Sequence, residues 1–366
     1  MTDFFTIDML PAREGDCIWI EYGDETQTHR ILIDGGRSSA YDTLRQRFDA
    51  LPAAERELDL LVCTHVDADH IEGLLKLIKD PSLPVRFKDV WFNGYVYLTR
   101  PTGTETFGAR QGEQLTDGIV DRQWSWNGAF GKQSVVVGDD GPLPLIELAG
   151  GMKVTLLSPH WPALEALQPV WKKECEKAGL IPGVQAEAEV DDGLERFGGL
   201  SVAKVRELAA APYKKDTSKA NGSSIALLLE FAGKTALLAG DAHGEAMEAS
   251  IGRLTGGGKL AVDVLKLSHH GSQGTLPPSL LDAVDCDSFL VSTDGSRHEH
   301  PDREAIARVV VSRDRAFSLI GNYRSAEMLE WDQASLKRTF GYSVRLPGDG
   351  EPDGIMRHRL LLQRLA

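Results

Sequence analysis

The chain has 366 residues, 42% of them hydrophobic and 26% charged, enough to bury an ordinary soluble core. Its 54 acidic residues against 40 Lys and Arg give a net charge of −14, which argues against a general nucleic-acid or anionic-membrane binder. No window approaches the roughly 18 apolar residues of a membrane span, and the start "MTDFFTIDML" does not resemble a signal peptide. The four cysteines lie far apart without a C-x-x-C pair, so we expect reduced thiols in a cytoplasmic protein.

The first 97 residues predict strands that alternate with helices. Strands are expected at 4–10, 17–23, 29–36, 58–65 and 85–97. Helices are expected at 41–51 and 71–80. The stretch "THVDADHIEGL" (64–74) therefore lies on the loop between a buried strand and the next helix. Active-site groups are common at this place in layered α/β folds.

The rest of the chain predicts further strands around a helical insertion. Residues 99–142 are rich in Gly, Thr and Trp and receive no assignment. Residues 161–220, with helical runs near 163–178 and 200–211, are interpreted as an insertion that could act as a lid. Hairpins are expected at 145–159 and 223–241, strands at 261–270, 286–292 and 357–365, and a short helix at 276–284.

Side chains that can ligate a metal recur where apolar strands end. They are His65, Asp67, Asp69, His70, His160, Asp241, His269, His270, His298 and His300, and include seven of the ten histidines. His and Asp suit hard to borderline divalent cations, which need donors from several strand ends meeting at one edge. A single histidine in such a place is more often structural. Together these residues predict a metal site.

Several of these motifs resemble a known fold. "THVDADHIEGL" resembles the His-x-His-x-Asp-His signature of the metallo-β-lactamase fold, with Asp67 in place of the second His, and "LLAGD" (237–241) resembles its bridging-Asp motif. "DVLKLSHHGS" followed by "HEHPD" is similar to the soluble hydrolase domain of the competence DNA-uptake channel family. "GDCIWIEYG" and "ILIDGG" match its opening strands. The resemblance implies one α/β domain over 1–366, a four-layer αββα sandwich with the helical insertion at 161–220.

The resemblance also implies two divalent metal ions, Zn²⁺ or Mn²⁺. His65 and Asp67 stand at the first metal, Asp69 and His70 at the second, and Asp241 at the bridging position. Asp69 would also orient the attacking water. Because Asp67 replaces an imidazole with a harder oxygen donor, it would favour Mn²⁺ or leave a single metal bound.

The remaining histidines leave alternatives open. His300 best matches the late metal ligand, and His160 would supply the third ligand of the first metal. His269 and His270 resemble a motif that contacts a substrate phosphate or donates a proton, although one of them could instead be the late ligand.

These assignments imply a metal-dependent hydrolase that uses a metal-bound hydroxide at a dinuclear site. The "HHGS…HP" pair favours a phosphodiester substrate, either a nucleotide or single-stranded nucleic acid. Lys214, Lys215 and Lys219 would contact phosphate, unless they only form a solvated loop. The alternatives are a metallohydrolase of esters, thioesters or amides, and a catalytically degenerate binding or sensor module. We expect no membrane partner.

Overall fold

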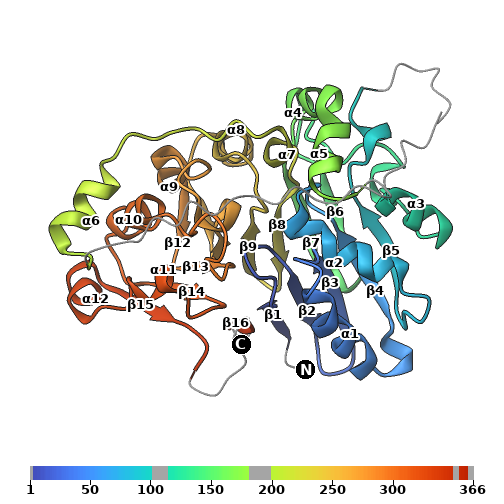
Figure 1. Ribbon diagram of the computed structural model, residues 1–366, viewed down its shortest axis with the longest axis horizontal. Helices are drawn as coiled ribbons and strands as arrows, with labels where there is room; N and C mark the ends of the chain where they lie inside the picture. Colours follow the sequence, from blue (N-terminus) through green and yellow to red (C-terminus); the bar gives the residue numbers. More distant parts are fainter. Residues whose placement is uncertain (1–2, 101–113, 181–198, 349–353, 362–366) are drawn as a thin grey trace.

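The computed structural model describes residues 3–100, 114–180, 199–348 and 354–361. Two large sheets lie face to face with helices on their outer sides, which is the predicted four-layer αββα sandwich (Figure 1). The first sheet contains β1 (Phe4–Met9), β2 (Ile18–Gly23), β3 (Thr28–Ile33), β4 (Glu57–Val62), β5 (Arg86–Trp91) and β16 (Met356–Leu360). Its order is β16-β1-β2-β3-β4-β5.

The second sheet has the order β15-β14-β13-β11-β9-β8-β7-β6. These strands are β6 (Leu145–Glu147), β7 (Lys153–Ser158), β8 (Ala226–Phe231), β9 (Lys234–Leu238), β11 (Val264–Lys266), β13 (Ser288–Val291), β14 (Phe317–Gly321) and β15 (Tyr342–Arg345). A small pair, β10 (Leu260–Val262) and β12 (Val284–Cys286), lies beside it. The hairpins predicted at 145–159 and 223–241 are confirmed as the antiparallel pairs β6–β7 and β8–β9.

Helices form the two outer layers. The longer ones are α1 (Ala40–Ala50), α2 (Ala68–Lys79), α3 (Gln114–Asp121), α6 (Val202–Ala209), α8 (Gly244–Thr255) and α10 (Arg303–Val311). The shorter ones are α4 (Trp161–Leu167), α5 (Trp171–Lys177), α7 (Lys219–Gly222), α9 (Pro278–Ala283), α11 (Ala326–Leu329) and α12 (Ala334–Phe340). Within the described ranges, no helix is both long and apolar enough to cross a bilayer.

The core follows from strand alternation. Leu60 faces the apolar layer between the two sheets, whereas its neighbour Leu61 faces the layer under α1 and α2. β4 is therefore buried on both faces, as its continuous apolar sequence predicts. β3, β4 and β5 run parallel, and so do β9, β11, β13 and β14, so each sheet presents a set of carboxyl ends.

The helical segment predicted at 161–220 is not one compact unit. Its residues 181–198 lie outside the described residues. Its first described part, α4 and α5, lies beside the first-sheet half, where Trp171 joins the core under α1 and α2. Its later helix α6 packs on α10 at the far side of the molecule (Figure 1). The two parts therefore serve different halves of the sandwich.

We expect the buried side chain of His358 to make the stability of the fold sensitive to acid. This β16 side chain is 9% exposed and lies opposite Ile7, and burial together with nearby Arg345 lowers its pKa to about 4. The unfolded chain takes up the proton near pH 6.5, so the free energy of unfolding falls as the pH drops from 6.5 towards 4. Between pH 7 and pH 4.5, we expect the free energy of unfolding to fall by about 2–3 kcal/mol less in His358→Gln than in the wild type.

Urea unfolding at the two pH values measures this difference. Arg359→Gln, at the exposed neighbouring position of the same strand, is the matched control and should lose as much stability as the wild type. An equal acid-induced loss in His358→Gln and wild type would refute the assignment.

Candidate metal centre

The loop after β4 delivers four polar side chains to one edge of the sandwich. β4 ends at Val62, and α2 begins at Ala68 with Asp67 as its N-cap residue. The helix starts three residues earlier than predicted, so Asp69 and His70 lie in its first turn. A carboxylate is favourable at this end of a helix because the peptide dipoles leave partial positive charge there. His65 and His70 are both buried.

Asp34, directly after β3, holds this loop from behind. Its Oδ1 accepts a hydrogen bond from the Thr64 amide at 2.8 Å, and its Oδ2 accepts one from the Thr64 hydroxyl at 2.7 Å. The same Oδ2 lies 2.8 Å from Nδ1 of His70. Thr64 Oγ1 lies 3.0 Å from Nδ1 of His65. With both Nδ1 atoms occupied, the two histidines present Nε2 to the site, as metal-ligating histidines do.

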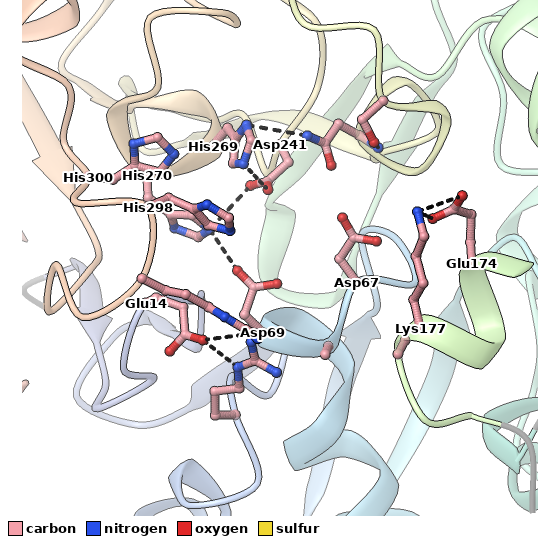
Figure 2. A pocket seen from close by; sticks show the side chains of 16 residues that line it. Glu14, Asp67, Asp69, Glu174, Lys177, Asp241, His269, His270, His298 and His300 are labelled. Carbon is pink, nitrogen blue, oxygen red and sulfur yellow. Dashed lines mark hydrogen bonds and ion pairs between the residues drawn. The ribbon is translucent and has the colours of Figure 1, made fainter. Parts of the chain in front are cut away.

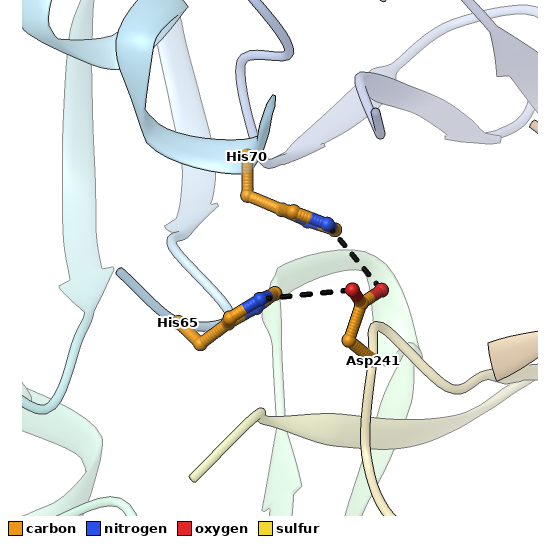
Figure 3. A group of neighbouring side chains, drawn as sticks. All are labelled: His65, His70 and Asp241. Carbon is orange, nitrogen blue, oxygen red and sulfur yellow. Dashed lines mark ion pairs between the residues drawn. The ribbon is translucent and has the colours of Figure 1, made fainter. Parts of the chain in front are cut away.

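Asp241 comes from the second sheet and lies next to the two histidines that follow β4 of the first sheet. It follows β9 and is 1% exposed. Its Oδ1 lies 3.3 Å from Nε2 of His70, and its Oδ2 lies 3.7 Å from Nε2 of His65, as Figure 3 shows. Each carboxylate oxygen thus faces a different histidine.

Four side chains form what we call the four-donor set: Asp69, His70, His270 and Asp241. Oδ2 of Asp69 lies 3.7 Å from Nε2 of His70 and 3.2 Å from Nε2 of His270. The two Nε2 atoms are 3.3 Å apart, and Nε2 of His270 is 3.7 Å from Oδ1 of Asp241. Donors bound to one tetrahedral ion at about 2.0–2.2 Å lie about 3.3–3.6 Å from one another. The observed spacing fits a shared cation.

His65, Asp67 and Asp241 form a second arrangement, the three-donor set. Nε2 of His65 lies 3.5 Å from Oδ2 of Asp67 and 3.7 Å from Oδ2 of Asp241. Both distances exceed those of good hydrogen bonds. Nε2 of His65 in this set and Oδ1 of Asp241, which faces the four-donor set, are both buried without any hydrogen-bond partner. Such orphaned donor atoms are costly in a buried place, and a bound cation would satisfy them.

The turn after β11 brings His269 and His270 in together. Both have positive φ, 48° and 55°, which is uncommon outside glycine and often marks a functional site. Nδ1 of His270 donates to the Ser292 carbonyl at 2.9 Å, which leaves Nε2 to the four-donor set. His269 lies beside it with Nε2 3.8 Å from Oδ2 of Asp241 and Nδ1 3.3 Å from the Asn221 amide nitrogen.

A buried ion pair supports His270 from the other side. Lys266 on β11 is 1% exposed and bonds to Asp16 of the β1–β2 connection, which is 2% exposed. The free oxygen Oδ1 of Asp16 lies 3.5 Å from Nδ1 of His270. This pair therefore links the two halves of the sandwich directly behind one member of the four-donor set.

The protonation of the centre indicates that cations would compete with protons. Burial opposes a charge on His70, but the carboxylates of Asp241, Asp69 and Asp34 outweigh it and hold its pKa well above 6.5. Burial also opposes a charge on His270, yet Asp241 and Asp16 raise its pKa to about 9. Without a metal, protons on these imidazoles offset the carboxylates. A divalent cation would displace these protons. The affinity of the centre for the cation should therefore decrease as the pH is lowered.

A pocket of about 300 Å³ opens onto this centre (Figure 2). The helix α5 and its C-cap residue contribute Glu174, Lys177 and Ala178 to its wall, and the loop after β13 contributes Arg297, His298 and His300. The other lining residues are Glu14, Arg37, Asp67, Ala68, Asp69, Ser218, Asn221, Asp241, His269 and His270. The donor sets are therefore accessible to a small substrate.

Two predicted ligands need correction. His300 lines the pocket with its Nδ1 3.1 Å from Oδ1 of Asp302, but among the described residues it belongs to no cluster of donor atoms, whereas His270 brings Nε2 within 3.2 Å of Oδ2 of Asp69. His160 does not reach the centre, because its Nε2 lies 3.2 Å from the Ala246 carbonyl and 3.0 Å from the Ser250 hydroxyl. The remaining predicted ligands, His65, Asp67, Asp69, His70 and Asp241, are brought together.

The predicted phosphate contacts also need correction. Lys214, Lys215 and Lys219 are exposed and do not line the pocket, and Lys215 lies 3.7 Å from Glu245. The cations that do line it are Arg37, Lys177 and Arg297. Sequence reasoning missed these three because they come from unrelated segments. It also gave no role to Asp16, which lies two residues before a buried strand.

The comparisons agree with this fold. Residues 10–162, which include the loop after β4, match the family model described as "Metallo-beta-lactamase superfamily". No curated protein matches the chain. Thirty-five solved chains match it.

Three of these structures indicate the range of similar proteins. A CmlA beta-hydroxylase mutant is 14% identical, with 98% of this chain and 54% of that chain covered and a TM-score of 0.39. The present chain thus spans about half of that protein. The metallo-beta-lactamase fold protein YhfI from Bacillus subtilis is 12% identical, with 98% and 100% covered and a TM-score of 0.38. Zn²⁺-bound PqqB from Methylobacterium extorquens is 13% identical, with 93% and 87% covered and a TM-score of 0.36.

Proposed function

We propose that this chain, with its metallo-β-lactamase superfamily domain, is a hydrolase that holds two divalent cations, Zn²⁺ or Mn²⁺, on either side of Asp241. The proposal rests on the position of the Asp241 carboxylate, whose two oxygens face different pairs of histidines. Oδ1 faces His70 and His270, whereas Oδ2 faces His65 and His269. A single carboxylate aimed at two sets of donors is suited to bridging two cations.

The donor chemistry fits this occupancy. The four-donor set offers two imidazoles and two carboxylates, a combination that suits Zn²⁺ and also Mn²⁺. The three-donor set has fewer donors and the half-exposed Asp67, so we expect its cation to bind more weakly. The cations would supply Lewis acidity and lower the pKa of a water.

The pocket charge favours an anionic substrate. Its lining contains five carboxylates (Glu14, Asp67, Asp69, Glu174 and Asp241) and three cationic side chains (Arg37, Lys177 and Arg297). Two divalent cations would turn this excess of two negative charges into an excess of two positive charges. A phosphodiester, which keeps a negative charge at neutral pH, is therefore a better match than a neutral ester or amide. The whole chain is acidic, so we propose a nucleotide-sized diester or a short single-stranded end.

His300 is the best-placed side chain to protonate a leaving oxygen. It lines the pocket next to His269, with their ring centroids 5.2 Å apart. Asp302 engages its Nδ1 at 3.1 Å, which fixes the ring and leaves Nε2 as the atom that can hold the transferable proton. His269 contacts Asp241 and Asn221, so we assign it to the cation and substrate side instead.

Hydrolysis of bis-p-nitrophenyl phosphate compared with p-nitrophenyl acetate tests the proposal, using protein loaded with Zn²⁺ or Mn²⁺. We expect turnover of the diester that a chelator abolishes, and a loss of roughly 10²–10⁴-fold in kcat for His300→Ala, in line with removal of a general acid. Because the leaving p-nitrophenolate needs little help from an acid, a dinucleotide diester, which expels a sugar alkoxide, is the substrate for this variant. His160→Ala, outside the pocket, is the matched control. Faster turnover of the acetate would favour the carboxylic-ester alternative.

A further inference from the structure

A second pocket adjoins the metal centre and has no role in the proposed hydrolysis. It has a volume of about 500 Å³. Its lining residues are Arg13, Glu14, Arg37, Ser38, Ser39, Glu72, Ser296 and Arg297. Glu14, Arg37 and Arg297 also line the pocket over the metal centre, so the two pockets share one wall.

The shared wall is held in place by ion pairs. Nε of Arg37 lies 2.6 Å from Oε1 of Glu14, and its Nη1 lies 3.0 Å from Oε1 of Glu72. Nη1 of Arg297 lies 3.7 Å from the same Glu14 oxygen. The side chain of Arg37 is only 14% exposed, so its position is well defined. Two arginines thus stand between the pockets with their carboxylate partners behind them.

Arg13 adds a third guanidinium that these carboxylates do not neutralise. Its backbone is fixed in the left-handed region, φ 58°, where its amide donates to the Tyr323 hydroxyl and its carbonyl accepts from the Asp294 amide, both at 2.9 Å. In the part of the chain that the structure describes, its exposed side chain forms no ion pair. The second pocket therefore holds three guanidinium groups against the two carboxylates of Glu14 and Glu72.

We propose that this second pocket binds a second phosphate of the substrate while the first phosphate lies at the metal centre. A guanidinium offers several N–H donors in a plane and suits phosphate oxygens, and the pocket also provides the hydroxyls of Ser38, Ser39 and Ser296. The substrate class is then a compound with two phosphates, one of which is the hydrolysed diester. This inference rests on the proposed function, because it places the other phosphate at the metal centre.

Equilibrium binding tests this without requiring turnover. Calorimetry with the Mn²⁺-loaded full chain compares thymidine 3′,5′-bisphosphate with thymidine 5′-monophosphate, and fructose 1,6-bisphosphate with fructose 6-phosphate. We expect each bisphosphate that fits both pockets to bind more tightly than its monophosphate. Arg13→Gln should reduce this ratio of affinities roughly 10-fold, the worth of one charge-assisted hydrogen bond. Arg13→Lys, which keeps the charge, should recover part of it.

The control is Arg86→Gln, an exposed arginine of β5 paired with Glu57 away from both pockets, which should leave the ratio unchanged. A preference for the thymidine compound alone would identify a nucleotide source, and a preference for both would identify recognition of the phosphate pair. An unchanged ratio in Arg13→Gln, or no preference in the wild type, overturns the inference. An Arg13-dependent preference in a protein without hydrolytic activity would keep the second pocket and refute the proposed function.

Discussion

Asp241→Asn is expected to reduce the rate of hydrolysis at least about 100-fold, which abolishes useful activity. This loss exceeds the effect usually seen for side chains that only orient a metal ligand. The physical reason is that Asp241 contributes an oxygen to both donor sets, at 3.3 Å from His70 and 3.7 Å from His65. An amide nitrogen cannot ligate a cation, and the neutral side chain removes the charge that holds the two sets together. Metal content after dialysis should fall together with activity.

Asp67→Asn is the matched comparison for this variant. Asp67 belongs to the three-donor set alone, and its side chain is 36% exposed, so its loss should weaken one cation and spare the four-donor set. We therefore expect one metal ion per chain to remain in Asp67→Asn. If both variants kept the wild-type metal content, the bridging role of Asp241 would be wrong.

Lys266→Met is expected to lower the free energy of unfolding by about 3–5 kcal/mol, because it removes the lysine that pairs with the buried carboxylate of Asp16. Lys266 and Asp16 are 1% and 2% exposed, so water cannot replace the lost partner. The nearby Lys266 ammonium, with His270, outweighs burial and lowers the pKa of Asp16 to about 2. Urea unfolding of chelator-treated protein at pH 7 measures the effect free of any metal contribution.

Two further variants separate charge from packing. Asp16→Asn combined with Lys266→Met removes both charges and should be less destabilised than Lys266→Met alone. Lys234→Met breaks a pair with Asp263 whose side chains are 22% and 29% exposed, and should cost only about 0–1 kcal/mol. If Lys266→Met cost no more than Lys234→Met, the pair would not be the buried support that its position indicates.

Much of the fold could be predicted because local pattern and burial agree. The continuous apolar run of β4 followed by His65–His70 located one corner of the centre, and the apolar hairpin ending in Asp241 located another. Parallel strands place their carboxyl ends at one edge, so the convergence of these residues follows from topology. Between residues 303 and 356 the sequence analysis named no element, and there the structure contains α10 to α12 together with β14 and β15.

Which of the late histidines joins the four-donor set could not be predicted, because it depends on backbone conformation. His269, His270 and His300 all follow apolar strands, and nothing in their spacing distinguishes them. The positive φ of His270 turns its ring inward, where the Ser292 carbonyl fixes Nδ1. His300 instead meets Asp302, two residues later. His160 was misassigned for a similar reason, since its partners on α8 lie 86 and 90 positions away.

The most direct test of the central claim is a crystal structure of the protein grown with Zn²⁺ or Mn²⁺, with anomalous diffraction measured on both sides of the metal's absorption edge. Our account predicts two anomalous peaks flanking the Asp241 carboxylate, one against Asp69, His70 and His270 and one against His65 and Asp67. The absence of any peak at Asp241 in protein saturated with these metals, or peaks only elsewhere, would contradict it.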